Sequence, residues 1–276
     1  MRDLNGATVL LTGASGGIGG CIAEELADVG ANLILTGRRE DALAEVRDRL
    51  ADRGKKAAVV PTDLANLDAI PALVEDAEAV VGPIDVLVNN AGIETAASFV
   101  RFSRDELTSM VDINLTAPML LTQHVLPAML QRGRGHVVFV SSGAGRYGPA
   151  YQGPYAATKA GLIALTQSLR AEYRGGPVGF SVVCPGFVEG DGMYQRMVDK
   201  GFRANRLMGS TTTRRVAKCV VQAIRTDSPE VNDTGRPMRP GIALSVMAPR
   251  LTECITARLG MTEMFHRLAA AHGRSA

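Results

Sequence analysis

Apolar runs of strand length alternate with segments of helical period along this sequence, and this alternation constrains the fold more than any other feature. Each run is nearly all apolar, which is typical of strands that are covered on both faces. The runs lie at residues 7–11, 32–36, 57–60, 84–88, 137–141 and 180–184. Strand followed by helix, repeated in this way, predicts an α/β fold: a single domain with a doubly wound, mostly parallel sheet and helices on both faces.

Two helical patterns carry further signals. One opens with Ser103 and Glu106 at the spacing of a capping box and continues through Asn114 toward Gln131. The other covers residues 249–260, with Pro near its start, Gly at its end and apolar residues at a spacing of four from Met247 to Leu259. Between them, after Asp227, the last strand expected of such a sheet is poorly marked.

Composition excludes several classes of protein. The chain has 276 residues, 46% hydrophobic and 21% charged, which is typical of a globular protein and excludes disorder, collagen and coiled coil. No stretch approaches the roughly 18 apolar residues of a membrane span, and the first apolar run is too short for a signal peptide, so we expect a cytoplasmic protein. Four widely spaced cysteines indicate neither disulfides nor a zinc site, and we expect no metal. Interspersed charges and 4% aromatic residues argue against nucleic-acid binding.

A glycine-rich segment, residues 12–19, lies between the first predicted strand and the first helix. At such a junction backbone amides and the helix N-terminus attract phosphate, and glycine lets a pyrophosphate approach the backbone. This pattern predicts a Rossmann-type dinucleotide site. The residues expected to bind the cofactor there are Gly13, Ser15, Gly16, Gly17, Ile18 and Gly19.

The end of the second predicted strand indicates which dinucleotide is bound. An enzyme that uses NAD would place an acidic residue there for the ribose hydroxyls, whereas this chain has Arg38 and Arg39. A guanidinium can hold the 2′-phosphate of NADP, so we expect NADP(H) to be preferred, with NAD(H) possible. The alternative is that both arginines are solvated charges at the start of the next helix.

A pair of residues on a later helix predicts acid–base chemistry. Tyr155 and Lys159 are four residues apart, so the phenol and the ammonium lie on one helical face, and the positive charge is expected to lower the tyrosine pKa. Ser142 ends the preceding strand, at the edge where ligands of such sheets bind.

Together these residues resemble the short-chain dehydrogenase/reductase family over about residues 5–226. The motifs that carry the resemblance are residues 12–19, 89–92, Asn114, Ser142, Tyr155 with Lys159, and 184–186. The resemblance implies hydride transfer between the nicotinamide and a carbonyl or alcohol carbon. It implies that Tyr155 is the general acid or base, that Ser142 binds the substrate oxygen, and that Lys159 and Asn114 form a proton relay.

The resemblance also implies further cofactor contacts. Asp63 and Leu64 would face the adenine, and Asn90, Ala91 and Gly92 would line the adenosine ribose. Tyr155, Lys159, Pro185, Gly186 and Val188 would lie on the nicotinamide side. Many members of the family place a threonine a few residues after the Pro-Gly pair; it is missing here, and we expect Thr211, Thr212, Thr213 or a backbone group to replace it.

Two segments outside these motifs bear on substrate specificity and on assembly. Residues 189–215, within a catalytic domain of residues 1–235, contain Met193, Tyr194, Met197, Val198, Phe202, Leu207 and Met208. They form either a lid over an apolar or lipid-like substrate or a helix pair that only covers the core. Residues 236–276 hold six Arg against two Glu, a net charge of +4. We expect this basic amphipathic extension to pack on its own domain or on a partner subunit, with contact to a membrane surface as the alternative.

The predicted function is therefore an NADP(H)-dependent oxidoreductase acting on a small-molecule carbonyl or alcohol, with a 3-oxoacyl thioester as one candidate. Two alternatives stay open. An NADP-binding sensor or scaffold would be expected to lack Tyr155 or Lys159, and a lyase, epimerase or dehydratase could use the same scaffold. The resemblance implies a homodimer or homotetramer.

Overall fold

The predicted strands form one parallel sheet in the computed structural model, which describes residues 3–190, 193–199, 201, 209–234, 247–271 and 274. The strands are β1 (Thr8–Thr12), β2 (Asn32–Thr36), β3 (Ala57–Val59), β4 (Val86–Asn89), β5 (Gly135–Val140), β6 (Val178–Pro185) and β9 (Glu230–Asp233). They lie in the order β3-β2-β1-β4-β5-β6-β9, and every neighbouring pair is parallel. This doubly wound sheet confirms the predicted fold class.

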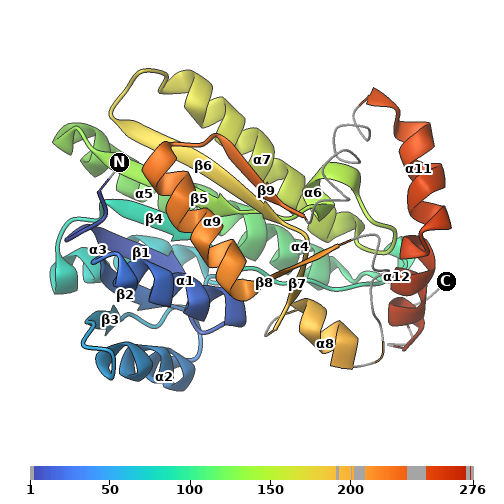
Figure 1. Ribbon diagram of the computed structural model, residues 1–276, viewed down its shortest axis with the longest axis horizontal. Helices are drawn as coiled ribbons and strands as arrows, with labels where there is room; N and C mark the ends of the chain where they lie inside the picture. Colours follow the sequence, from blue (N-terminus) through green and yellow to red (C-terminus); the bar gives the residue numbers. More distant parts are fainter. Residues whose placement is uncertain are drawn as a thin grey trace.

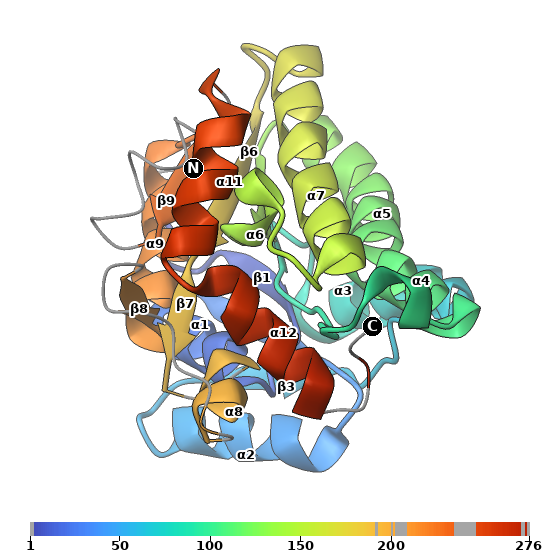
Figure 2. The ribbon, with the colours of Figure 1, turned by 90° about the vertical axis from the view of Figure 1, so that its right-hand side faces the viewer.

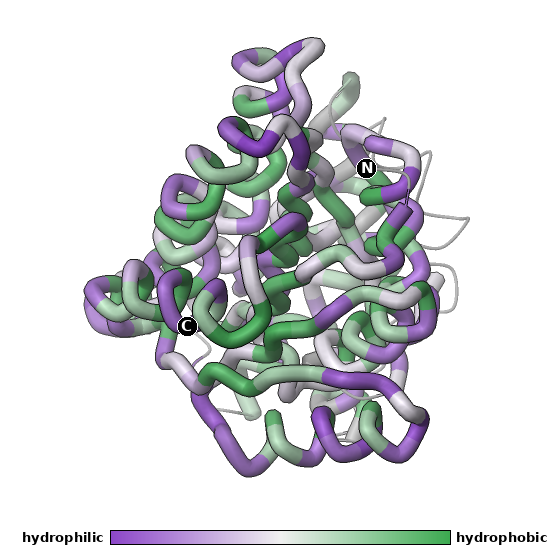
Figure 3. The backbone as a smooth tube through the Cα atoms, turned by 90° about the vertical axis from the view of Figure 1, so that its left-hand side faces the viewer, coloured by the Kyte–Doolittle hydropathy of each residue, from purple (hydrophilic) through white to green (hydrophobic). Residues whose placement is uncertain are grey.

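Helices cover both faces of the sheet because alternate strand residues point to opposite sides. On β1, Val9 and Leu11 pack toward one group of helices and Leu10 packs toward the other. The first group is α1 (Gly17–Asp28), α2 (Glu40–Ala51) and α9 (Thr213–Thr226), and the second is α3 (Ile70–Val81), α5 (Ala117–Arg132) and α7 (Gly153–Glu172) (Figure 1). The hydrophobic segments accordingly gather at the centre, within the outer turns of the helices (Figure 3).

The helical pattern from Ser103 toward Gln131 is interrupted in the structure. Ser103 caps α4 (Arg104–Val111), and its capping box with Glu106 is present, as predicted. A π-helical segment, Asp112–Thr116, then separates α4 from α5. Pro118 has no N–H to donate to the carbonyl of Asn114, so one α-helical hydrogen bond is missing where the π-helical segment meets α5.

The last strand of the sheet, β9, is an edge strand that the apolar pattern marked poorly. It pairs with β6, and its polar residues are held by distant partners. Glu230 is ion-paired with Arg146, and Asp233 with Arg215. A second, two-stranded sheet joins β7 (Phe187–Glu189) to β8 (Ser210–Thr212) beside the main sheet.

Four further helices gather at the end of the sheet where the strands finish: α6 (Ala144–Tyr147), α8 (Met193–Asp199), α11 (Pro249–Arg258) and α12 (Met261–Ala271) (Figures 1 and 2). The helix predicted at residues 249–260 is confirmed as α11, but its apolar stripe is not buried, since Met247 is 85% exposed and Leu251 50%. The buried face of this part of the chain belongs to α12. Among the described helices, none is long and apolar enough to cross a membrane.

Candidate active site

Two adjoining cavities lie at the carboxyl edge of the sheet and share Ile18, Asn90 and Gly92 in their walls. The larger, of about 360 Å³, brings together the predicted dinucleotide-binding residues Gly13, Ser15, Gly16, Gly17, Ile18, Gly19, Arg38, Arg39, Asp63, Leu64, Asn90, Ala91 and Gly92. The smaller, of about 120 Å³, brings together Ser142, Tyr155, Lys159, Pro185, Gly186 and Val188. The structure therefore divides the predicted site into a cofactor cavity and a catalytic cavity.

The glycine-rich loop is fitted closely against neighbouring backbone. Gly13 has a φ of +65°, and a Cβ there would lie 2.8 Å from the Ala91 Cα. A Cβ on Gly19 would lie 2.1 Å from the Gly13 carbonyl oxygen. Asn90 fixes the loop from β4, because its side-chain amide donates to the carbonyl oxygens of Thr12, at 3.0 Å, and Gly13, at 3.2 Å. Only glycine fits at these two loop positions.

The first turn of α1 faces the cofactor cavity with its backbone amides unused by side chains. Gly16 caps the helix without a side-chain hydrogen bond, and the first turn carries no acidic residue. A helix N-terminus of this kind offers N–H donors and a partial positive charge to an anion. Arg38 and Arg39 are exposed beside it, and Arg39 Nη2 lies 3.5 Å from the Ser15 carbonyl oxygen. The loop, the helix end and the two arginines suit a phosphorylated ligand.

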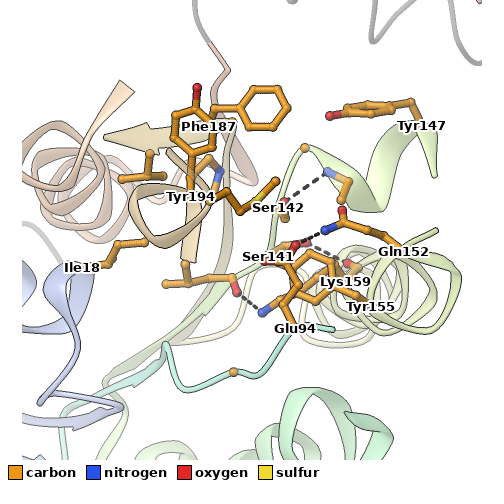
Figure 4. Close-up of a pocket in the computed structure, with 18 of the residues that line it drawn as sticks. Ile18, Glu94, Ser141, Ser142, Tyr147, Gln152, Tyr155, Lys159, Phe187 and Tyr194 are labelled. Atoms are coloured by element: carbon orange, nitrogen blue, oxygen red, sulfur yellow. Dashed lines mark hydrogen bonds between the residues drawn. The ribbon is translucent and has the colours of Figure 1, made fainter. Parts of the chain in front are cut away.

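The catalytic cavity joins the end of β5 to the start of α7. Ser142 follows β5, and its hydroxyl accepts from the Ala144 amide at 3.1 Å and is hydrogen-bonded to Tyr155. Lys159 is 3% exposed, its Nζ donates to the Val140 carbonyl oxygen at 2.9 Å, and it lies 5.7 Å from the centre of the Tyr155 ring. Figure 4 shows these side chains at one end of the cavity, with Phe187 and Tyr194 at the other.

Burial controls the proton affinities here, and for Tyr155 the direction is opposite to the one expected from the sequence. Burial raises the pKa of the Tyr155 phenol, the charge of Glu94 raises it further, and the hydrogen bond to Ser142 opposes the rise. Burial lowers the pKa of Lys159 to about 8, while Cys184 and Glu94 oppose that change. For Tyr155 the largest cause is removal of the phenol from water, which disfavours its charged form.

Asn114 lines neither cavity and lies in the π-helical segment, next to the helix that carries Tyr155 and Lys159. Its side-chain amide donates to the Ile93 carbonyl oxygen at 2.8 Å and to Thr158 Oγ1 at 3.2 Å. Its oxygen accepts from the Ile93 amide at 2.8 Å. Asn114 thus ties the segment after β4 to the helix that carries Tyr155 and Lys159.

The three threonines expected to replace the missing one each have a hydrogen-bond partner within the protein. Thr211 is hydrogen-bonded to Asp233, and Thr212 caps α9 by accepting from the Arg215 amide at 3.3 Å. Thr213 Oγ1 lies 3.2 Å from the sulfur of Cys21.

Several residues of the catalytic cavity were not predicted as site residues. Glu94 and Gln152 form a hydrogen-bonded pair in its wall, next to Tyr147. Phe187, which follows β6, and Phe265 of α12 also line it and were not predicted. Tyr194 and Met197 of the predicted lid line it as well. Of the predicted lid, the side chain of Met193 and all of Phe202, Leu207 and Met208 lie outside the described residues. Within the described part of the chain, no three His, Cys, Asp or Glu residues gather as metal ligands.

Comparison with known proteins identifies the family. The sequence model of the short chain dehydrogenase family matches residues 7–200. Ketoacyl reductase HetN from Nostoc sp. is 42% identical over 248 residues, which are 90% of this chain and 85% of that protein. The 3-oxoacyl-[acyl-carrier-protein] reductase FabG from Vibrio cholerae is 38% identical over 189 residues, 68% of this chain and 76% of FabG.

A solved structure agrees with this identification. The 3-oxoacyl (acyl-carrier-protein) reductase from Agrobacterium tumefaciens, with NADP bound, superposes with a TM-score of 0.77 and is 29% identical; the match covers 85% of this chain and 95% of that one. This chain therefore belongs to the short-chain dehydrogenase/reductase family of oxidoreductases.

Proposed function

We propose that this protein is an NADP(H)-dependent oxidoreductase that reduces an apolar ketone to a secondary alcohol, a 3-oxoacyl thioester being one candidate. The observation that carries the proposal is the meeting of Ser142, Tyr155 and Lys159 in one cavity that adjoins the cradle for a dinucleotide. The relatives named above as ketoacyl and 3-oxoacyl reductases support it, as does the NADP in the Agrobacterium structure.

The residues of the cofactor cavity fit NADP(H). Gly13 and Gly19 add no side chain where the backbone is closely packed, and the α1 N-terminus has no side-chain cap that would compete with the pyrophosphate. Arg38 and Arg39 line the same cavity, and their guanidinium groups suit the 2′-phosphate. Asp63 lies in the same wall, where its carboxylate accepts from the Ala65 amide at 3.0 Å. When bound, the nicotinamide supplies the hydride for the carbonyl carbon.

The catalytic residues handle the proton and the substrate oxygen. The Tyr155 phenol, whose pKa burial raises further above neutral, is protonated at neutral pH, and this is the form that can donate a proton to a carbonyl oxygen. The Ser142 hydroxyl, already hydrogen-bonded to Tyr155, is placed to bind that same oxygen. Lys159 and Asn114 lie behind them as the proposed relay, and the positive charge of Lys159 stabilises negative charge that develops on the phenol.

The test is fluorescence titration with NADPH and NADH, followed by a screen of cofactor oxidation over ketones, steroids, quinones and oxoacyl thioesters. We expect NADPH to bind at least tenfold more tightly, and we expect Arg38→Ala or Arg39→Ala to remove that preference. Arg47→Ala is the matched control, since Arg47 lies on α2 and pairs with Asp48 away from the cavity.

Turnover distinguishes the enzyme classes. Tyr155→Phe should lower kcat by roughly 10²–10⁴, the usual contribution of a positioned general acid. Tight NADPH binding without turnover of any carbonyl would instead support the sensor, and product formation without net cofactor oxidation would support a lyase or epimerase. A cytoplasmic location and assembly into a homodimer or homotetramer stay predictions.

A further inference from the structure

The helix α12 forms part of the wall of the catalytic cavity, although it lies beyond the residues matched by the family model. Phe265 is 2% exposed, and it lines the cavity together with Tyr194 and Met197 of α8. Figure 2 shows α12 crossing in front of the sheet edge, close to α8. The apolar residues of α12 recur at helical spacing on its buried face: Met261, Met264, Phe265 and Leu268.

Arg274, three residues after the end of α12, fastens this helix to the start of α4. Its guanidinium donates to both carboxylate oxygens of Glu106, at 2.6 and 2.5 Å, and to the Arg101 carbonyl oxygen at 3.2 Å. It also lies 5.6 Å from the centre of the Phe102 ring. The Arg274 carbonyl oxygen accepts from the Ser98 amide at 2.9 Å. Two-pronged pairing of this kind fixes geometry as well as charge.

Glu106 is a firm anchor because its carboxylate is already held by the capping box. It accepts from the Ser103 amide at 3.0 Å while it pairs with Arg274. These contacts lower the pKa of Glu106 to about 2, with the hydrogen bond from Arg274 as the largest cause. The pair therefore stays ionised at any pH at which the protein is expected to work.

The cavity that α12 helps to line is small. Its volume of about 120 Å³ lies well below the roughly 300–1,000 Å³ of typical ligand pockets. Figure 4 shows the rings of Phe187 and Tyr194 at the end of the cavity away from Tyr155 and Lys159, and Phe265 of α12 also lines the cavity. A substrate carbonyl held at Tyr155 therefore has room for only a short apolar group on the side that faces α12.

We propose that α12 is a size filter for the substrate: the Phe265 ring limits the length of the apolar group next to the carbonyl, and Arg274 is the positioning residue that holds the helix in place. The substrate class is a compact apolar carbonyl compound, or a longer molecule with only a short chain on the enclosed side. This inference rests on the proposed function, since it concerns the selection of substrate for that reaction.

The test compares kcat/KM for the best carbonyl substrate of the screen with kcat/KM for analogues of that substrate whose chain is longer by two, four and six methylenes. In the wild type we expect kcat/KM to fall steeply as the substrate chain is lengthened. In Phe265→Ala and Phe265→Leu the ratio of long to short substrate should rise by about fourfold for each methylene that becomes buried. Phe265→Leu keeps an apolar side chain of moderate size, so it remains informative if the alanine variant does not fold.

Arg274 is tested separately from the cavity wall. Arg274→Gln should raise the same ratio, mainly through KM, and should speed hydrogen–deuterium exchange of the α12 amides without changing NADPH affinity by more than twofold. Arg274→Lys keeps the charge but not the two-pronged geometry, so its ratio of long to short substrate should lie between those of the wild type and Arg274→Gln. The matched control is Arg267→Gln: Arg267 lies on the same helix, pairs with Glu263 and has a 69% exposed side chain, so length selection should not change.

The outcomes separate the two proposals. Suppose that the wild type turns over its substrate and that the ratio of long to short substrate in both Phe265→Leu and Arg274→Gln stays within twofold of the wild-type ratio. This result would overturn the size filter and leave the proposed function intact. Wild-type turnover that does not decline with chain length would also overturn it. Absence of NADPH-dependent turnover with every carbonyl would remove the proposed function, and the filter with it.

Discussion

Replacement of Lys159 by methionine should stabilise the protein without cofactor while abolishing its activity. Lys159 is 3% exposed, and burial lowers its pKa from 10.5 to about 8. At about 1.36 kcal/mol for each pKa unit, this change corresponds to roughly 3 kcal/mol against the charged form in the folded state. Loss of the hydrogen bond to the Val140 carbonyl oxygen would offset about 1 kcal/mol of the gain. Lys159→Met should therefore raise the free energy of unfolding at pH 7 by about 2 kcal/mol.

The sign of the pH dependence follows from the two pKa values. Below pH 8 both the folded and the unfolded wild type carry the proton, so the folded state bears the full cost of the buried charge. Between pH 8 and 10.5 the unfolded state keeps more of the proton, and the wild type gains stability as pH rises. The difference between Lys159→Met and the wild type should therefore shrink over this range.

Urea unfolding of both proteins at pH 7 and pH 9.5, followed by circular dichroism, measures this difference. Lys218→Met is the matched control, because Lys218 is an exposed lysine on a helix and its replacement should give no comparable dependence on pH. A Lys159→Met protein that is less stable than the wild type at pH 7, or a stability difference that is the same at both pH values, would refute the reasoning.

Two further predictions concern the glycine-rich loop and the pKa of Tyr155. Gly19→Ala should destabilise the protein by several kcal/mol and abolish NADPH binding, because its Cβ would lie 2.1 Å from the Gly13 carbonyl oxygen. In Gly16→Ala, where the nearest atom would be 3.5 Å away, thermal melting should be nearly unchanged, and equal melting of the two variants would contradict the steric argument. Glu94→Gln removes a charge that raises the Tyr155 pKa, so the alkaline limb of the pH profile for reduction should move to lower pH. A limb that stays in place or moves upward in the measured profile would show that Glu94 does not act on Tyr155.

The strands that could be predicted are those buried on both faces, and the exception has a physical cause. The inner strands β1, β2, β4, β5 and β6 are mostly apolar because helices cover both their sides, and β3, at the opposite edge from β9, is a short run of Ala and Val that is half-buried. Strand β9 lies at the sheet edge, where Glu230 and Asp233 are neutralised by Arg146 and Arg215. Arg146 is far from Glu230 in sequence, so no local pattern could show that these charges fit a strand.

The convergence of the residues expected to bind the cofactor could be predicted for a similar reason, and Tyr194 and Met197 of the predicted lid line the catalytic cavity, whereas the place of Phe265 in its wall could not be predicted. Turns that follow parallel strands meet at one edge, so the glycine loop, Asn90 and Ser142 converge once the sheet is predicted. Phe265 reaches the same edge from a helix that follows the last strand. An apolar residue on an amphipathic helix looks the same in sequence whether it covers a core or lines a cavity. Only the packing of α12 distinguishes the two.

A shifted pKa indicates a residue of the candidate active site only where that residue also lines a cavity. Burial lowers the pKa of His136 to about 4 and raises that of Cys184 to about 12, changes comparable to the one at Lys159. Neither residue lines the two cavities, and His136 is hydrogen-bonded to Ser181 inside the sheet. Lys159, by contrast, is buried and still reaches a space that a ligand can enter. A buried charge beside such a space is a cost that folding alone does not require, and that combination is the reason for proposing Lys159, and not His136 or Cys184, as a member of the site.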